Sequence, residues 1–205
     1  MKLEEIDNLL SHAITCIQIP DLSNLLFDGK GEIELNRRLS IAIENCGYSS
    51  RVEVSVPRAK GARTHSDIVL FDSLKQEVIA CIECKSCITP DVYKRAKPNN
   101  NFNRIKDDVE KYAVHNYSPL YTVMWAIHWD DFPKEDSSCL EQFKYFDMHK
   151  KMHVSGFLIE ELQDSIRDAL FQVGLGYPIH QSIIGPFDQW RGCRASLIAT
   201  LSRVL

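Results

Sequence analysis

The sequence DIVLFDSLKQEVIACIECKS, from Asp67 to Ser86, predicts a β-hairpin that carries charge at its open end. Two apolar runs flank the polar turn DSLKQ, which is the pattern of two short antiparallel strands. The first run opens with Asp67, and the second ends in Glu83-Cys84-Lys85. Opposed side chains on neighbouring strands lie about 5 Å apart at the β-carbon. We therefore expect two carboxylates and an ammonium to meet at one end of the sheet.

These residue types favour a divalent cation between the two acids. Two carboxylates at that distance repel each other unless a positive group lies between them. Mg²⁺, or Mn²⁺ in its place, prefers oxygen ligands and is commonly held by one or two carboxylates plus substrate phosphate. Such a cation polarises a phosphoryl oxygen and acidifies a water. Lys85, with its pKa lowered by the cation and by burial, would orient or deprotonate that water.

The same residues also have an interpretation without a metal. Asp67 is a suitable turn residue at the start of a strand, and Glu83 with Lys85 fits a solvated charge pair that contributes little. On this alternative the chain is a metal-free interaction protein.

The pattern along the chain predicts an α/β (α+β) fold with a central mixed β-sheet flanked by helices. Apolar periodicity and turn residues place the elements. We expect helices at 3–18, 32–45, 102–115, 159–174 and after Gly192 to the end, with strands at 51–56, 67–71, 77–85, 120–129 and 182–185, and a short helix within 140–155. We expect one domain over 1–205, with a C-terminal helical part at about 140–205 that has no assigned role.

The order of helix, strand, acid-bearing strand, E-x-K strand, helix and strand resembles the PD-(D/E)XK nuclease superfamily, whose core is restriction-endonuclease-like. The similarity covers a core of about residues 30–129. The motif stands here as SDIVLF (66–71) and IECKS (82–86), after the helix EIELNRRLSIAIENCGY (32–48). Ser66 stands where the family has its name-giving proline.

This resemblance implies a metal-dependent endodeoxyribonuclease that acts on DNA in restriction, phage defence or repair. Asp67 and Glu83 would bind metal, the backbone carbonyl of Cys84 would add a ligand, and Lys85 would be the catalytic lysine. Glu32 would supply a further acid, with Glu34 as the alternative. The other reading is a catalytically silent DNA-binding or assembly module with the same fold. Double-strand cutting would require two active sites, and hence a homodimer.

A DNA partner would need local basic patches, because the net charge of −4 and the pI near 6.0 provide no basic field over the whole chain. Two segments flank the predicted hairpin and could contact phosphates. They contribute Arg58, Lys60 and Arg63 before it, and Lys94, Arg95 and Lys97 after it. The alternative is that both are solvated loops without a ligand.

The start of the chain, MKLEEIDNLL, lacks the basic end and apolar run of a signal peptide, and no apolar stretch reaches membrane-spanning length. We expect a cytoplasmic protein without membrane contact, and reduced thiols at its seven cysteines. Cys81, Cys84 and Cys87 have a metal-like spacing. Because strand side chains alternate, we expect Cys84 to point away from the other two, so that one metal does not reach all three.

Overall fold

The fold is built around one six-stranded mixed sheet with the strand order β1-β2-β3-β4-β6-β5. The computed structural model describes residues 1–19, 31–57, 63–72, 74–75, 77–88, 92, 101–113, 119–131, 158–176, 178–188 and 194–204. The elements are α1 (Leu3–Thr15), α3 (Gly31–Asn45), β1 (Ser49–Pro57), β2 (Arg63–Asp72), β3 (Glu77–Ile88), α5 (Asn101–Ala113), β4 (Leu120–Asp131), α7 (Ile159–Gln172), β5 (Pro178–Asp188) and β6 (Arg194–Val204). β3 and β4 are parallel, and the other neighbouring strands are antiparallel.

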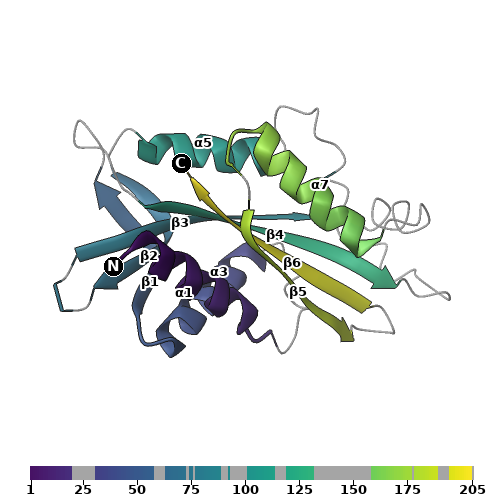
Figure 1. Cartoon of the computed structure of the whole chain (residues 1–205), viewed down its shortest axis with the longest axis horizontal. Helices are drawn as coiled ribbons and strands as arrows, with labels where there is room; N and C mark the ends of the chain where they lie inside the picture. Colours follow the sequence, from purple (N-terminus) through teal and green to yellow (C-terminus); the bar gives the residue numbers. More distant parts are fainter. Residues whose placement is uncertain are drawn as a thin grey trace.

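Helices cover both faces of the sheet, which gives three layers. Figure 1 shows α1 and α3 on one face, and α5 and α7 on the other. Each pair of helices packs on the sheet through its own apolar cluster, so the fold has two cores. The predicted class, α+β with a central mixed sheet and flanking helices, is confirmed.

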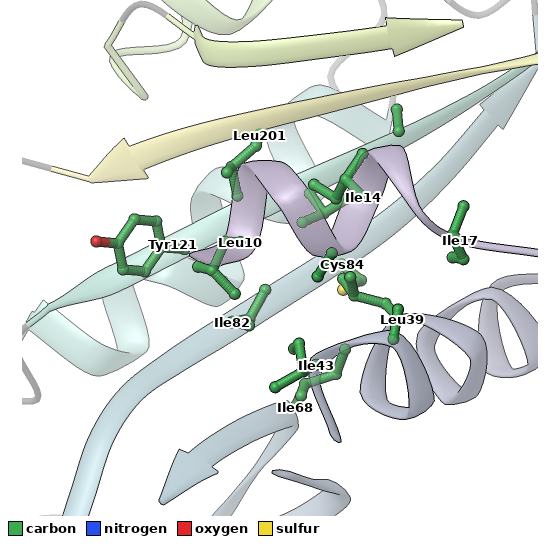
Figure 2. Packing of buried hydrophobic residues seen from close by; sticks show 14 of the residues in the cluster. Leu10, Ile14, Ile17, Leu39, Ile43, Ile68, Ile82, Cys84, Tyr121 and Leu201 are labelled. Atoms are coloured by element: carbon green, nitrogen blue, oxygen red, sulfur yellow. The ribbon is translucent and has the colours of Figure 1, made fainter. Parts of the chain in front are cut away.

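The α1–α3 core joins the two N-terminal helices to the middle strands. Leu10 and Ile14 of α1 and Leu39 and Ile43 of α3 are completely buried. Figure 2 shows them together with side chains of β2, β3, β4 and β6. The strand residues labelled there are Ile68, Ile82, Cys84, Tyr121 and Leu201.

The predicted helices at 32–45, 102–115 and 159–174 are confirmed as α3, α5 and α7, with ends shifted by at most two residues. Gly47, with a φ of +87°, follows α3 at a position where a side chain would be strained. The first helix ends at Thr15, three residues earlier than predicted, and Leu3 is half exposed rather than inward. Its first turn extends past the edge of the core, which begins at Ile6.

The predicted hairpin is confirmed, since β2 and β3 are antiparallel and pair Ile68 with Ile82. The pairing shifts by one residue between Leu70 and Phe71, which marks a β-bulge near the turn. The strands predicted at 51–56 and 120–129 are present as β1 and β4. The short strand at 182–185 lies within the longer β5.

The end of the chain corrects the sequence prediction, because residues 194–204 form strand β6 and not a helix. β6 lies between β4 and β5 in the sheet, and the helices on either side bury both of its faces. Leu197 and Leu201 enter the α1–α3 core, whereas Ile198 enters the α5–α7 core. A short apolar run buried on both faces lacks strand alternation, and its periodicity cannot distinguish it from a buried helix.

The predicted C-terminal helical part is therefore wrong for residues 178–188 and 194–204, which complete the sheet. The short helix predicted within 140–155 lies outside the described residues. None of the described helices combines the length and the apolar character needed to cross a membrane.

Candidate functional site

The charged residues of the hairpin lie where the sheet opens between β2 and β3. Pairing of β2 with β3 runs from Asp72↔Glu77 to Ile68↔Ile82. Beyond that point β2 continues with β1 as far as Pro57↔Arg63, and β3 continues with β4 as far as Ile88↔Ile127. One further step of the same register places Asp67 opposite Glu83. The two acids therefore lie at the junction where the strands separate.

At this junction the carboxylate of Asp67 accepts a hydrogen bond from β3, whereas backbone carbonyls are the acceptors where two strands pair. Its Oδ2 accepts a hydrogen bond from the backbone N–H of Cys84 at 2.7 Å. Among the described residues, no second donor contacts the carboxylate, which leaves Oδ1 available. Burial raises the pKa of Asp67 to about 6, and Glu32 and Glu53 add to the rise, whereas the Cys84 N–H and Lys85 oppose it.

Glu83 is one of the few charged side chains inside the protein, with 4% of its surface exposed. Buried carboxylates are costly unless they are paired, hydrogen-bonded or bound to a metal. The pKa of the neighbouring Cys81 thiol is raised to about 11, mainly by burial and also by the Glu83 charge, whereas a hydrogen bond with Ser66 opposes the rise. The position of Glu83 one pleat before Lys85 is as the sequence predicts.

Lys85 lies between two carboxylates that come from opposite faces of the sheet. Its Nζ is 3.5 Å from Oε1 of Glu32, on α3, and 3.2 Å from Oδ2 of Asp108, on α5. Burial lowers the pKa of Lys85, but Glu32 and Asp108 outweigh it, so the pKa lies above its usual value. The sequence suggested a lowered pKa for Lys85, but these two acids raise it. Lys85 is therefore an ammonium at neutral pH.

The structure selects Glu32 over Glu34 as the helix acid that reaches the junction. Oε2 of Glu32 accepts hydrogen bonds from the backbone N–H of Ser86 at 2.7 Å and from its Oγ at 3.2 Å. Glu34 is instead held by Arg38, whose Nε lies 2.8 Å from its Oε1. The alternative metal acid is therefore turned away from Lys85.

Asp108 is the member of this cluster that sequence reasoning missed. It borders the apolar stripe of α5, since Phe102, Ile105 and Val109 are all buried. Asp107, one position earlier, is exposed. The sequence shows only that Asp108 lies beside the buried stripe of α5. Nothing in the local sequence indicates that α5 packs so that Asp108 contacts Lys85.

Most of the predicted DNA-binding residues fall outside the part of the chain that the structure describes. Arg58, Lys60, Lys94, Arg95 and Lys97 lie outside the described residues. Arg63 is the first residue of β2, and only its backbone is described. The strand thus begins four residues before Asp67, which places the predicted basic segment next to the junction along the chain.

Glu53 is an unexpected neighbour of this junction. It lies on β1 between residues that pair with Ser66 and Ile68, which places it across from Asp67. Its φ of +53° is unusual for a residue other than glycine and is the sign of local backbone strain. Its charge is one of those that raise the pKa of Asp67.

The three closely spaced cysteines lie on opposite faces of β3, as their alternation predicts. Cys81 and Cys87 belong to the α5–α7 core, and Cys84 belongs to the α1–α3 core. Burial raises the pKa of the Cys84 thiol, so a thiolate is disfavoured there. Among the residues that the structure describes, no three histidine, cysteine or acidic side chains are already placed to hold a metal ion.

A cavity of about 640 Å³ lies at the other end of β2 and β3, near the turn. Its walls include Tyr48, Phe71, Leu74 and Val78. It contains none of the residues of the charged cluster, so we do not connect the two.

Comparison with models of protein families, with curated proteins and with solved structures finds no match for this chain. The junction between β2 and β3 must therefore be interpreted from its own chemistry.

Proposed function

We propose that this protein is a Mg²⁺-dependent nuclease that hydrolyses phosphodiester bonds of DNA on a restriction-endonuclease-like core of the PD-(D/E)XK kind. The observation that supports it is the junction between β2 and β3. There Asp67 and Glu83 lie opposite each other, and Lys85 follows one pleat later. At this junction the two acids and the lysine are no longer flanked by a β2–β3 backbone pairing, since that pairing ends at Ile68 and Ile82.

The donor set suits a hard cation. Carboxylates and carbonyls are the ligands that Mg²⁺ and Mn²⁺ prefer, and Mg²⁺ usually needs only one or two carboxylates beside waters and substrate phosphate. Asp67 and Glu83 would supply these two, with Glu32 and the Cys84 carbonyl as further oxygens. The pKa of about 6 leaves Asp67 ionised at neutral pH. When bound, the cation would polarise a phosphoryl oxygen and acidify a water.

The charge balance favours the same conclusion. The carboxylates of Glu32, Asp67, Glu83 and Asp108 lie around the junction. Lys85 forms ion pairs with those of Glu32 and Asp108 and interacts electrostatically with that of Asp67. Desolvated acids of like charge raise one another's pKa unless a positive group compensates them. A divalent cation would therefore be attracted by the residues already present.

Lys85 would act as a charged hydrogen-bond donor. Its pKa lies above the usual value, so the ammonium cannot take up a proton at neutral pH. Its donors would orient the attacking water and stabilise the charge that develops on the phosphoryl oxygens. The water oxygen would form a bond to phosphorus and release its proton to solvent, while the bond to the 3′-oxygen breaks with its electron pair and the leaving oxygen takes a proton from solvent.

Binding of DNA at this acidic junction would need basic residues, since the protein as a whole is negative, and two basic segments flank the hairpin in the sequence. Arg58, Lys60 and Arg63 precede β2, and Lys94, Arg95 and Lys97 follow β3. We propose these residues as phosphate contacts. A homodimer would be needed for cutting both strands at one place.

The test is incubation of the protein with supercoiled and linear DNA, with Mg²⁺, with Mn²⁺ and with a chelator. Nicked or linear plasmid should appear only with a divalent cation. Lys85→Met and Asp67→Asn should slow this cleavage strongly and leave only a small residual rate. Lys106→Met is the matched control, because Lys106 is a more exposed lysine that pairs with Glu110 on α5.

Failure to cleave with either cation, or equal cleavage by Lys85→Met, would overturn the proposal. Salt-dependent DNA binding without cleavage would instead favour the catalytically silent module. Absence of both DNA and Mn²⁺ binding would leave the metal-free interaction protein.

A further inference from the structure

We propose that Asp108 is the positioning residue for Lys85, and that it holds the ammonium in place when a cation engages Glu32. This inference deepens the proposed nuclease function and rests on it. Asp108 belongs neither to the hairpin motif nor to the first helix, and its role follows from its contact with Lys85.

The ammonium has two carboxylate neighbours in the described part of the chain. Asp108 Oδ2 is the closer one at 3.2 Å, and Glu32 Oε1 lies at 3.5 Å. The Lys85 side chain is only 14% exposed, so water cannot readily replace a lost partner. A buried ammonium without a carboxylate would be strongly disfavoured.

Glu32 cannot serve Lys85 and a cation equally well. Its Oε2 is occupied by the N–H and hydroxyl of Ser86, and its Oε1 faces Lys85. A divalent cation bound by Glu32 would withdraw charge from this oxygen and repel the ammonium. The carboxylate that then remains on Lys85 is that of Asp108.

Asp108 is well placed for such a role, because α5 is anchored to the sheet. Phe102, Ile105 and Val109 are buried in the α5–α7 core on either side of it. A side chain on a helix fixed by packing holds its partner more accurately than one on a loop. Asp108 thus sets the direction in which Lys85 points, without any need to touch the substrate itself.

The first test does not depend on activity. The ¹⁵Nζ–H signal of Lys85, assigned with Lys85→Arg, is detectable only while the ammonium is held and protected from exchange with water. Glu32→Gln keeps an acceptor for Ser86 and removes the charge beside Lys85, as a cation would. The signal should persist in Glu32→Gln and disappear in Glu32→Gln/Asp108→Asn. Its persistence in the double variant would overturn the inference.

Glu32→Gln/Asp107→Asn is the matched control, since Asp107 is an exposed acid of the same helix turn. Its signal should persist. Melting temperatures of all variants identify any that fail to fold, and in that case Glu32→Gln/Asp108→Ser replaces the double variant.

The second test is kinetic and uses the Mg²⁺-loaded protein with plasmid DNA. Asp108→Ala should lower kcat about 10- to 100-fold, as loss of an orienting partner does. KM should stay within about twofold, because the proposed role of Asp108 is to orient Lys85 and not to bind DNA. Asp108→Glu should recover part of the rate. In a Lys85→Ala background, Asp108→Ala should have no further effect.

Unchanged kcat in Asp108→Ala, or an equal loss in the Lys85→Ala background, would contradict the positioning role. If the wild-type protein does not cleave DNA, the proposed function fails, and the ¹⁵Nζ signal still decides whether Asp108 holds Lys85.

Discussion

The backbone N–H of Ser86 donates a 2.7 Å hydrogen bond to Oε2 of Glu32, although 54 residues separate them in the chain. This contact joins the first turn of α3 to β3 at the point where β3 has left β2. It brings the Glu32 carboxylate to Lys85 and leaves Glu34 with Arg38. Two acids that are almost neighbours in the sequence therefore have different surroundings.

The first prediction separates these two acids. Under the proposed function, Glu32→Gln should slow Mg²⁺-dependent cleavage about 100-fold or more, because a fixed charge at the proposed reacting centre is lost. Glu34→Gln should keep the rate within about twofold and lose at most about 0.5 kcal/mol of stability, since it removes only a part-exposed i,i+4 ion pair. Initial rates of plasmid nicking and urea unfolding provide both quantities. A larger rate loss in Glu34→Gln would assign the role to the other acid.

The second prediction concerns metal binding and pH. Asp67 has a pKa of about 6, raised mainly by burial, so a proton competes with the cation below that pH. The affinity for Mn²⁺ should be nearly constant above about pH 7 and fall about tenfold per unit below about pH 6. Calorimetric titration at several pH values measures this. An affinity that does not change between pH 5 and pH 7, about the range around that pKa, would exclude Asp67 as a ligand.

The third prediction applies the same pKa to folding. The folded state holds the Asp67 proton between its usual pKa of 3.8 and about 6, whereas the unfolded chain releases it. Asp67 therefore contributes its full stability below about pH 4, and this contribution is lost as the pH rises through about 6. The free energy of unfolding of Asp67→Asn, relative to that of wild type, should therefore increase as the pH rises from about 4 to about 7. Urea unfolding at several pH values measures this difference.

Asp72 provides a control of opposite sign for this experiment. The backbone N–H groups of Lys75 and Leu74 lower its pKa, so its contribution is present above its usual pKa and lost as the pH falls. Asp72→Asn should therefore lose stability relative to wild type at neutral pH, and the difference should shrink in acid. Parallel trends in the two variants would show that neither carboxyl is responsible.

The fourth prediction tests the central position of β6. Leu201 is completely buried in the α1–α3 core, whereas Ile183 on the edge strand β5 is 40% exposed. Leu201→Ala should cost about 2–5 kcal/mol of unfolding free energy through lost burial and the cavity left behind. Ile183→Ala should cost clearly less. Urea unfolding compares the two, and equal costs would contradict the described placement of β6.

The fifth prediction concerns a buried polar pair between α3 and β4. Trp125 donates its indole N–H to Oδ1 of Asn36 at 3.1 Å, and both residues are buried. Asn36→Leu leaves the indole N–H without an acceptor and should cost about 1–3 kcal/mol. Combining it with Trp125→Phe should recover part of that cost, because both polar partners are then gone. Additive costs in urea unfolding would show that the hydrogen bond contributes nothing.

Much of the fold could be predicted from local patterns. The helices α3, α5 and α7 and the strands β1 to β4 lie where the sequence predicts them, although β2 begins four residues earlier and β3 ends three residues later than predicted. β6 could not be predicted in this way, because it is buried on both faces and its apolar residues Leu197, Ile198 and Leu201 therefore do not alternate along the strand. Its identity as a strand depends on β4 and β5, which pair with it from either side.

The sequence by itself determined the hairpin, and hence that Asp67, Glu83 and Lys85 lie at one end of two strands. The two-residue repeat of a strand is a local property, and a turn of known position sets the register. Only the tertiary structure decided that the strands separate there, that Glu32 rather than Glu34 reaches Lys85, and that Asp108 holds the ammonium from the opposite face. These contacts depend on how the helices pack on the sheet, and no pattern within a single element specifies that packing.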